Sequence, residues 1–372
     1  MKPLRVAVVG AGHLGRIHAQ KLAGMDGVSL VGIADPIETS RAAVAQAHGT
    51  QAFSDHRQLG RLVDAVVVAT PTRWHHAVAL DLLNDGVHVL VEKPLAPTGA
   101  ECAELVDTAR RRSLVLQVGH VERFNPALDA VLPYVRSPKY IEAVRRGGFT
   151  FRSTDIGAVL DLMIHDIDVI LALVQSPLRQ VDALGLSLLG RHEDVVNARL
   201  SFANGCVATL SASRVSRTAA RTMQIWSRRG FAAVDFAARS ATLIHPSETL
   251  LRREFDAEGL SSDDRQRLKD SLLSEHLSVE KLAVEPCDAI TAELLDFTDS
   301  IRTGRMPKVT GEQGRDAVAV AEQVLAAMAS HAWDGTADGP VGPLALPPAA
   351  VIRAPHWGLK RADNPLEHRE AG

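Results

Sequence analysis

The stretch GAGHLG fills residues 10–15 and directly follows a β-branched apolar run, residues 4–9. The spacing GxGxxG between a strand and a helix is typical of a turn that binds the diphosphate of a dinucleotide. Gly10 permits the tight turn, Gly12 removes the side chain where the diphosphate approaches, and Gly15 lets the helix pack closely on the strand. The sequence therefore predicts a strand, a phosphate-binding turn and a helix near the N-terminus.

The start of this helix and the next apolar run complete a dinucleotide site. The amides of His13 and Leu14 lie at the predicted helix N-terminus, where they can bind diphosphate oxygens. Asp35 ends a second apolar run, residues 28–34, about 20 residues beyond Gly15, where a carboxylate can bind both hydroxyls of the adenosine ribose. The carboxylate would repel a 2′-phosphate, and no arginine directly follows it, so we expect NAD rather than NADP. The alternative is a glycine turn that serves packing alone.

Apolar runs and helical stretches alternate through the first part of the chain. Further apolar runs predict strands at residues 65–69, 87–91 and 114–118. Helical patterns occur at residues 17–22, 74–84 and 98–112. Strands that are buried on both faces and separated by helices form a parallel sheet. We therefore expect residues 1–120 to form a doubly wound α/β domain, an NAD-binding Rossmann domain.

Beyond residue 120 the pattern changes to a series of strands. A helical pattern at residues 157–174 precedes strand-like runs at 181–189, 194–203, 205–215, 221–227, 230–236 and 239–245. The pair Asn204-Gly205 predicts a tight hairpin between two of these runs. An exposed helix or excursion is expected at 261–276, and closing helices at 289–302 and 312–332. Residues 121–335 should thus form an α+β domain with a mainly antiparallel sheet, and the proline-rich residues 336–372 a tail without regular elements.

The composition excludes several classes of function. The chain has 372 residues, of which 46% are apolar and 23% charged, with a net charge of −3. This size indicates two domains, and the charge gives no reason to expect a nucleic-acid partner. No apolar run is long enough for a membrane span or a signal peptide. Three scattered cysteines, without a CxxC spacing, argue against disulfides and a thiolate metal site and favour the reducing cytoplasm: Cys102, Cys206 and Cys287.

A lysine lies where ligands bind to open α/β sheets. Glu92-Lys93-Pro94 ends the predicted strand at residues 87–91. Lys93 therefore lies at the carboxyl end of a parallel strand, which is the ligand-binding edge. A solvated charge at a strand end explains the lysine equally well.

A carboxylate and a histidine are spaced by one helical turn. Asp161 and His165 should project from the same face of the helix predicted at residues 157–174. An imidazole can take a proton near neutral pH, and a nearby carboxylate can orient it. The alternatives are a hydrogen-bonded histidine on a half-buried helix and a metal site that adds Asp168. Three residues on one helix make a poor tetrahedral shell, so we expect no metal.

Taken together, these motifs resemble the glucose-fructose oxidoreductase and inositol dehydrogenase family (Gfo/Idh/MocA). The resemblance covers residues 3–333. It rests on GAGHLG, on ATPT at residues 69–72 with His75, on Glu92-Lys93-Pro94, on Asp161-x3-His165-Asp166-x-Asp168, and on Phe-x3-Ile-x2-Gly-x2-Pro-x3-Gly from Phe297 to Gly311.

The resemblance implies a Rossmann domain joined to an α+β domain whose open sheet forms the interface of a homo-oligomer, a dimer or a tetramer. It implies catalytic roles for Lys93, Asp161 and His165. It also implies further cofactor-binding residues, namely Thr70, Pro71, His75, Glu92, Lys93 and Gln117. Arg123 would be a substrate-binding residue near the domain junction.

Two stretches resemble a bacterial subgroup of this family that oxidises UDP-N-acetylglucosamine at C3. They are GHVERFNP at residues 119–126 and DLMIHD at residues 161–166. If the substrate is a UDP-sugar, the guanidinium groups of Arg145, Arg146 and Arg152 could pair with its diphosphate. The alternative for each arginine is the solvated face of an edge strand.

The resulting hypothesis is an NAD-dependent dehydrogenase that oxidises a carbinol of a sugar or nucleotide sugar. A free-sugar or inositol dehydrogenase and a non-catalytic NAD-binding regulatory protein are the alternatives, since a fold alone does not determine function. A transferase or hydrolase is disfavoured because the sequence has neither GxSxG nor CxxC.

Overall fold

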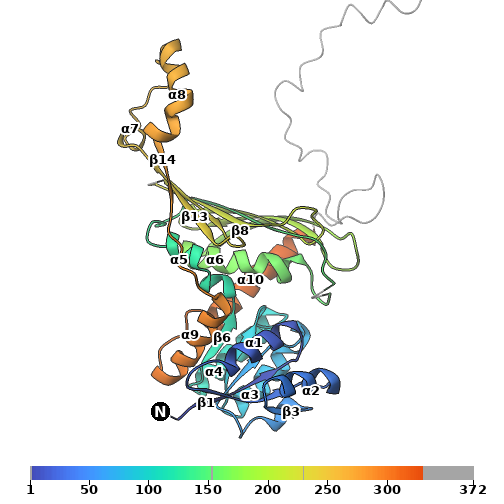
Figure 1. Ribbon diagram of the computed structural model, residues 1–372. Helices are drawn as coiled ribbons and strands as arrows, with labels where there is room; N and C mark the ends of the chain where they lie inside the picture. Colours follow the sequence, from blue (N-terminus) through green and yellow to red (C-terminus); the bar gives the residue numbers. More distant parts are fainter. Residues whose placement is uncertain (1, 152–153, 229, 330–372) are drawn as a thin grey trace, which may run out of the picture.

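The computed structural model describes residues 2–151, 154–228 and 230–329. The predicted tail, residues 336–372, lies outside these residues. Figure 1 shows a first, helix-covered sheet and a second, larger sheet, with α5, α6 and α10 lying between the two sheets. The proposed division of the chain at residue 120 remains a prediction.

Six parallel strands form the first sheet in the order β3-β2-β1-β4-β5-β6. The strands are β1 (Leu4–Val9), β2 (Val28–Ala34), β3 (Gln51–Phe53), β4 (Ala65–Val68), β5 (His88–Glu92) and β6 (Leu116–Gly119). The connecting helices are α1 (His13–Ala23), α2 (Glu38–Ala47), α3 (His75–Asn84) and α4 (Gly99–Arg111). The predicted doubly wound α/β domain is therefore confirmed. The sequence pattern missed α2 and β3, and β3 is too short and too exposed to leave an apolar run.

Eight strands form the second sheet in the order β14-β13-β12-β11-β7-β10-β9-β8. They are β7 (Tyr140–Arg146), β8 (Leu178–Leu186), β9 (Val195–Phe202), β10 (Val207–Ser213), β11 (Ala220–Ser227), β12 (Gly230–Asp235), β13 (Ser240–Pro246) and β14 (Leu277–Lys281). Neighbours are antiparallel except β7 and β10, which run parallel. The mainly antiparallel sheet is confirmed, as is the hairpin at Asn204-Gly205, where Gly205 has a φ of +81°.

The position of β7 corrects one expectation. β7 pairs with β10 on one side and with β11 on the other, so it lies in the middle of the sheet. Arg145 and Arg146 are therefore not on an edge strand. The sequence could not show this, because β7 and its two partners are far apart along the chain.

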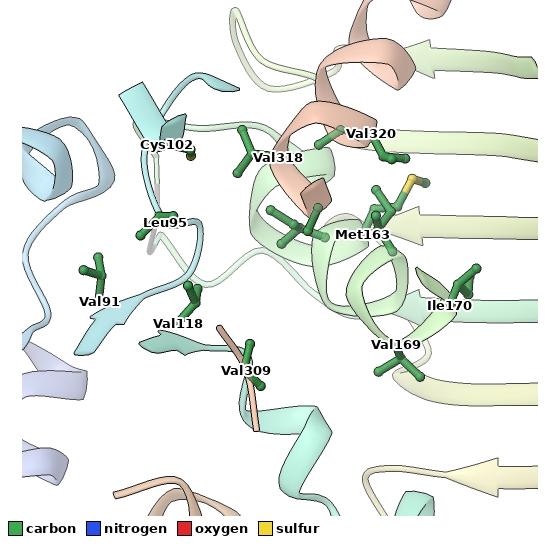
Figure 2. Close-up of a cluster of buried hydrophobic side chains, with 14 of the residues drawn as sticks. Val91, Leu95, Cys102, Val118, Met163, Val169, Ile170, Val309, Val318 and Val320 are labelled. Carbon is green, nitrogen blue, oxygen red and sulfur yellow. The ribbon is translucent and has the colours of Figure 1, made fainter. Parts of the chain in front are cut away.

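Helices join the two sheets through one continuous apolar core. The helices on the second sheet are α5 (Pro126–Val131), α6 (Ile164–Val174), which follows a π-helical turn (Val159–Met163), and α10 (Gly311–Met328). Figure 2 shows this core running from Val91 and Val118 in the first sheet to Met163 and Ile170 beneath the second, with Val318 of α10 between them. Residues at the junction of the two sheets are thus packed against the apolar core of each sheet.

Two further helical segments belong to other parts of the fold. Helix α9 (Ala289–Thr303) inserts Leu294 and Phe297 into the core around β1 of the first sheet. Helices α7 (Glu248–Leu251) and α8 (Ser262–Glu275) project with β14 beyond the sheet edge, which confirms the predicted excursion (Figure 1). No helix in the described part of the chain has the length and apolarity to cross a membrane.

Candidate active site

The glycine turn has the geometry that a dinucleotide diphosphate requires. Gly10 has a φ of +101°, and a Cβ there would lie 2.4 Å from the carbonyl oxygen of Ala69. A Cβ on Gly15 would lie 1.8 Å from the carbonyl oxygen of Gly10, whereas one on Gly12 would meet no atom within 4 Å. Gly10 and Gly15 are therefore required by the backbone itself, and the open space at Gly12 is where a ligand can approach.

The N-terminus of α1 presents uncapped amides beside this space. Gly12 is the N-cap and no side chain caps the helix, while His13 and Leu14 are exposed. Asp35 accepts hydrogen bonds from the amide of Ala11 at 2.7 Å and from the amide of Ile37 at 2.8 Å, so its carboxylate is held at the edge of the turn. A carboxylate has further lone pairs for ribose hydroxyls. These residues fit the phosphates and the adenosine ribose of a nicotinamide dinucleotide.

His75 lies behind the predicted nicotinamide side of the site. Its ring is buried between the carbonyl oxygen of Pro94, at 2.7 Å from Nδ1, and that of Thr70, at 2.8 Å from Nε2. Burial lowers its pKa, so the ring is neutral and donates to one carbonyl at a time. His75 therefore links the loops that follow β4 and β5. Pro71 is exposed beside it, and the hydroxyl of Thr70 is buried with no hydrogen-bond partner among the residues that the structure describes.

Lys93 connects the first sheet to the second domain. Its Nζ donates to the backbone oxygen of Asp161 at 2.6 Å and to Oδ1 of Asp161 at 3.0 Å. The ammonium group keeps a third N–H for another acceptor. The solvated-charge interpretation of Lys93 is therefore wrong, because its side chain is only 13% exposed and spans the junction of the domains.

Asp161 does not orient His165 directly. Residues 159–163 form a π-helical turn, and Asp161 points to Lys93; in the described part of the chain no hydrogen bond joins Asp161 to His165. The expectation of a carboxylate–histidine pair one helical turn apart assumed a regular α-helix. Single π-helical turns are frequent at functional sites, where they redirect a side chain.

His165 is prepared to act as a base. Burial lowers its pKa well below the ordinary value, and the charges of Lys93 and Arg145 add to this effect. In the described part of the chain its Nδ1 is buried and has no hydrogen-bond partner. The lowered pKa favours the neutral ring near pH 7, and a neutral imidazole has one nitrogen that can take a proton.

His120 packs against His165, and the sequence reasoning did not select it. The two ring centroids are 6.3 Å apart and the rings are nearly perpendicular. His120 is completely buried, burial lowers its pKa, and neither of its ring nitrogens has a partner in the described structure. Its place directly after β6, at the carboxyl edge of the sheet, was the signal that could have found it.

Glu92 belongs to a buried polar cluster beneath Lys93. Its Oε1 accepts from Nε2 of His18 at 2.7 Å, and its Oε2 accepts from the amide of Lys93 at 3.3 Å. Glu293 of α9 lies beside them, and Nε2 of the buried Gln117 donates to the backbone oxygen of Glu293 at 3.0 Å. The family resemblance implies that Glu92 and Gln117 bind the cofactor. In the structure their side chains form hydrogen bonds to other residues of the protein.

Among the described residues, this cluster is also the group of side chains whose ligand atoms lie close enough together to hold a metal ion. Ligand atoms of His18, Glu92 and Glu293 lie within 4.8 Å of one another. Burial and the charge of Glu92 raise the pKa of Glu293 well above its usual value, which favours the neutral acid beside the Glu92 carboxylate. Asp161, His165 and Asp168 do not converge on one point, since Asp161 pairs with Lys93 and Asp168 with Arg123.

The arginines predicted to bind the substrate differ in their burial and in their partners. Arg145 is 3% exposed and donates to Glu122 Oε1 at 2.8 Å and to Asp166 Oδ1 at 2.8 Å. Its predicted contact with a substrate diphosphate is therefore wrong, because both partners are supplied by the protein. Arg123 lies 3.4 Å from Asp168 at the domain junction. Arg146 is exposed, and Arg152 lies outside the described residues.

Comparison with known protein families matches both halves of the chain. Residues 4–120 match an oxidoreductase family described as having an NAD-binding Rossmann fold, and residues 134–233 match the GFO/IDH/MocA C-terminal domain. The first match covers all six strands of the first sheet, and the second covers β7 to β11 of the second sheet.

Individual relatives cover most of the chain. A UDP-N-acetylglucosamine 3-dehydrogenase of Acidithiobacillus ferrooxidans is 36% identical over 330 residues, which are 87% of this chain and 97% of the relative. A solved structure of that enzyme covers 88% of this chain and 98% of its own, with a TM-score of 0.78 and 35% identity. A scyllo-inositol 2-dehydrogenase (NAD(+)) of Bacillus subtilis is 27% identical over 57% of this chain and 68% of its own length. A levoglucosan dehydrogenase solved with NADH shares the fold, with a TM-score of 0.75 and 19% identity over 88% of this chain and 97% of its own.

Proposed function

This chain belongs to the Gfo/Idh/MocA oxidoreductase family, and we propose that it is an NAD-dependent dehydrogenase that oxidises UDP-N-acetylglucosamine at C3. The observation that carries the proposal is that Lys93, at the carboxyl edge of a sheet whose first turn fits a dinucleotide, binds Asp161 in the helical turn that leads to His165. An acid–base pair beside a hydride acceptor is what oxidation of a carbinol needs.

The choice of substrate rests on the relative that covers nearly the whole chain. The 36% identity to the UDP-N-acetylglucosamine 3-dehydrogenase extends through both domains. The scyllo-inositol dehydrogenase matches only 57% of this chain. Inositols and free sugars therefore serve as the alternative substrates to test.

Bound NAD supplies the hydride acceptor. His165, as a neutral imidazole, takes the proton of the C3 hydroxyl as the C3 hydride leaves, so that the carbinol becomes a ketone. The Lys93 ammonium donates its remaining N–H to the same oxygen and stabilises the negative charge that develops there.

The other site residues have supporting roles in this proposal. Asp161 holds the Lys93 ammonium in place, and Glu92, itself held by His18, accepts a hydrogen bond from the Lys93 backbone amide. His13, Leu14 and Asp35 bind the dinucleotide, with Thr70 and Pro71 on its nicotinamide side. Arg123 remains a proposed substrate residue.

The assembly and location are proposed as well. The resemblance favours a homo-oligomer, and the mass of the purified protein by light scattering tests this. The three cysteines are free thiols, which supports a reducing cytoplasm.

The experiment is a substrate panel. Purified protein and NAD are incubated with UDP-N-acetylglucosamine, free N-acetylglucosamine and myo-inositol, and NADH absorbance is followed. The proposal predicts the highest kcat/KM for the UDP-sugar. A higher value for inositol or for the free sugar would reject the UDP-sugar assignment, and no NADH with any sugar would favour a non-catalytic NAD-binding protein.

A further inference from the structure

An exposed arginine lies at the start of β11, close to the candidate base. Arg221 is directly opposite Arg145 in the antiparallel pair of β11 and β7. Residues directly opposite each other on neighbouring strands point to the same face of a sheet. Arg145 points to α6, where it binds Asp166, the residue after His165. The side chain of Arg221 therefore leaves the sheet on the face that carries His165.

The charge of Arg221 is not used inside the protein. Arg145 already has two carboxylate partners, Asp166 and Glu122. Arg221 is exposed, and in the described part of the chain its guanidinium makes no hydrogen bond or ion pair. The positive charge of Arg221 lowers the pKa of His165, although burial and the influences of Lys93, Arg145 and His120 are larger. This agrees with a location of Arg221 near the His165 ring. A free cation beside a reaction centre is suited to an anionic part of the substrate.

We propose that Arg221 binds the diphosphate of the nucleotide-sugar substrate. This inference rests on the proposed function. A guanidinium pairs with phosphate oxygens through two parallel hydrogen bonds, which fix orientation as well as affinity. Binding of the remote diphosphate positions the sugar carbon for hydride transfer.

The neighbouring arginine Arg146 does not fit this role. It follows Arg145 along β7, and successive side chains of a strand point to opposite faces. Arg146 is exposed as well, but on the face away from α6 and His165. It is thus a matched control of the same residue type, one position along the neighbouring strand.

The test compares Arg221→Gln, Arg221→Lys and Arg146→Gln. UDP binding to the NAD-loaded protein is measured by isothermal titration, and KM for UDP-N-acetylglucosamine by NADH absorbance. We expect Arg221→Gln to weaken UDP and raise KM by about 10- to 100-fold. Arg221→Lys should lose less, and Arg146→Gln should stay within about twofold of the wild type, as expected of a solvated surface charge. NAD affinity and Tm should be unchanged in all three.

Each result separates the inference from the proposed function. If the wild type oxidises UDP-N-acetylglucosamine but Arg221→Gln binds UDP as well as Arg146→Gln does, the role of Arg221 is rejected and the function stands. If the wild type neither binds UDP nor oxidises the UDP-sugar, the proposed function fails and the inference with it. A loss of NAD affinity or Tm in Arg221→Gln would also reject the inference, since it would show a structural role.

Discussion

The dinucleotide turn and the catalytic corner lie at the same edge of the first sheet, yet they are built differently. The turn consists of consecutive residues 10–15 and of Asp35 at the end of the next strand. The catalytic corner, defined here as Lys93, His120, Asp161 and His165, takes residues from β5, the end of β6, a π-helical turn and α6. The turn is thus fixed by local backbone geometry, whereas the corner depends on the packing of one domain on the other.

This difference predicts which substitutions remove catalysis and which remove cofactor binding. Changes in the corner should leave the turn able to bind NAD. Changes in the turn should leave the acid–base groups in place.

The largest effect is expected from Arg145→Met, which removes the central cation beneath α6. Asp166 and Glu122 would remain buried without their partner, which costs about 3–5 kcal/mol. Urea denaturation of the whole protein measures this loss. Arg146→Met, on the exposed side of the same strand, should change stability by about 0.5 kcal/mol or less. Equal midpoints for the two variants would contradict the structural role given to Arg145.

Lys93→Ala and His165→Ala should each lower kcat by about 10²-fold or more, because acid–base groups typically contribute that much. NAD affinity, measured by fluorescence titration, should stay near that of the wild type. His76→Ala is the control, since His76 pairs with the exposed Glu104 away from the corner. Near-normal turnover in either variant would remove that residue from the mechanism.

Asp35→Ala acts on the turn instead of the corner. Loss of the carboxylate removes the repulsion of a 2′-phosphate and the contact with the ribose, so the preference for NAD over NADP should shrink by about tenfold or more. Titration of both cofactors measures the ratio. The wild type should bind NAD more tightly, and tighter binding of NADP would contradict the assignment.

The smallest effect is expected on kcat/KM when the pH is lowered from about 7.5 to 6.5. Because the pKa of His165 lies well below its ordinary value of 6.5, the neutral base persists as the pH falls through 6.5. The value of kcat/KM for UDP-N-acetylglucosamine should therefore change by less than about twofold between about pH 7.5 and 6.5, and should fall only at lower pH. A loss of half the rate at pH 6.5 would show that the histidine titrates as in water.

The same difference explains how much the sequence could predict. Gly10, Gly12, Gly15 and Asp35 were predicted from spacing alone, since their roles are set within one strand–helix–strand unit. The strands of both sheets were found from apolar runs, except β3, β7 and β14.

Of the catalytic corner, the sequence predicted Lys93, Asp161 and His165, but neither His120 nor the contacts among the four residues. Lys93 and His165 could be selected from their places at a strand end and on a helix, but the Lys93–Asp161 pair follows from the π-helical turn, which no spacing rule reveals. Arg145 was misjudged because its burial depends on β7 lying in the middle of the sheet, between strands distant in sequence. Contacts across such distances are decided by packing and not by local pattern.

We propose that this chain transfers the C3 hydrogen of UDP-N-acetylglucosamine to NAD. The most direct measurement uses UDP-N-acetylglucosamine with deuterium at C3 and follows the mass of the NADH formed. We predict that the deuterium appears in the reduced nicotinamide and that His165→Ala forms this product about 10²-fold more slowly. NADH formed without deuterium would place the oxidation at another carbon, and no NADH at all from the UDP-sugar would contradict the account.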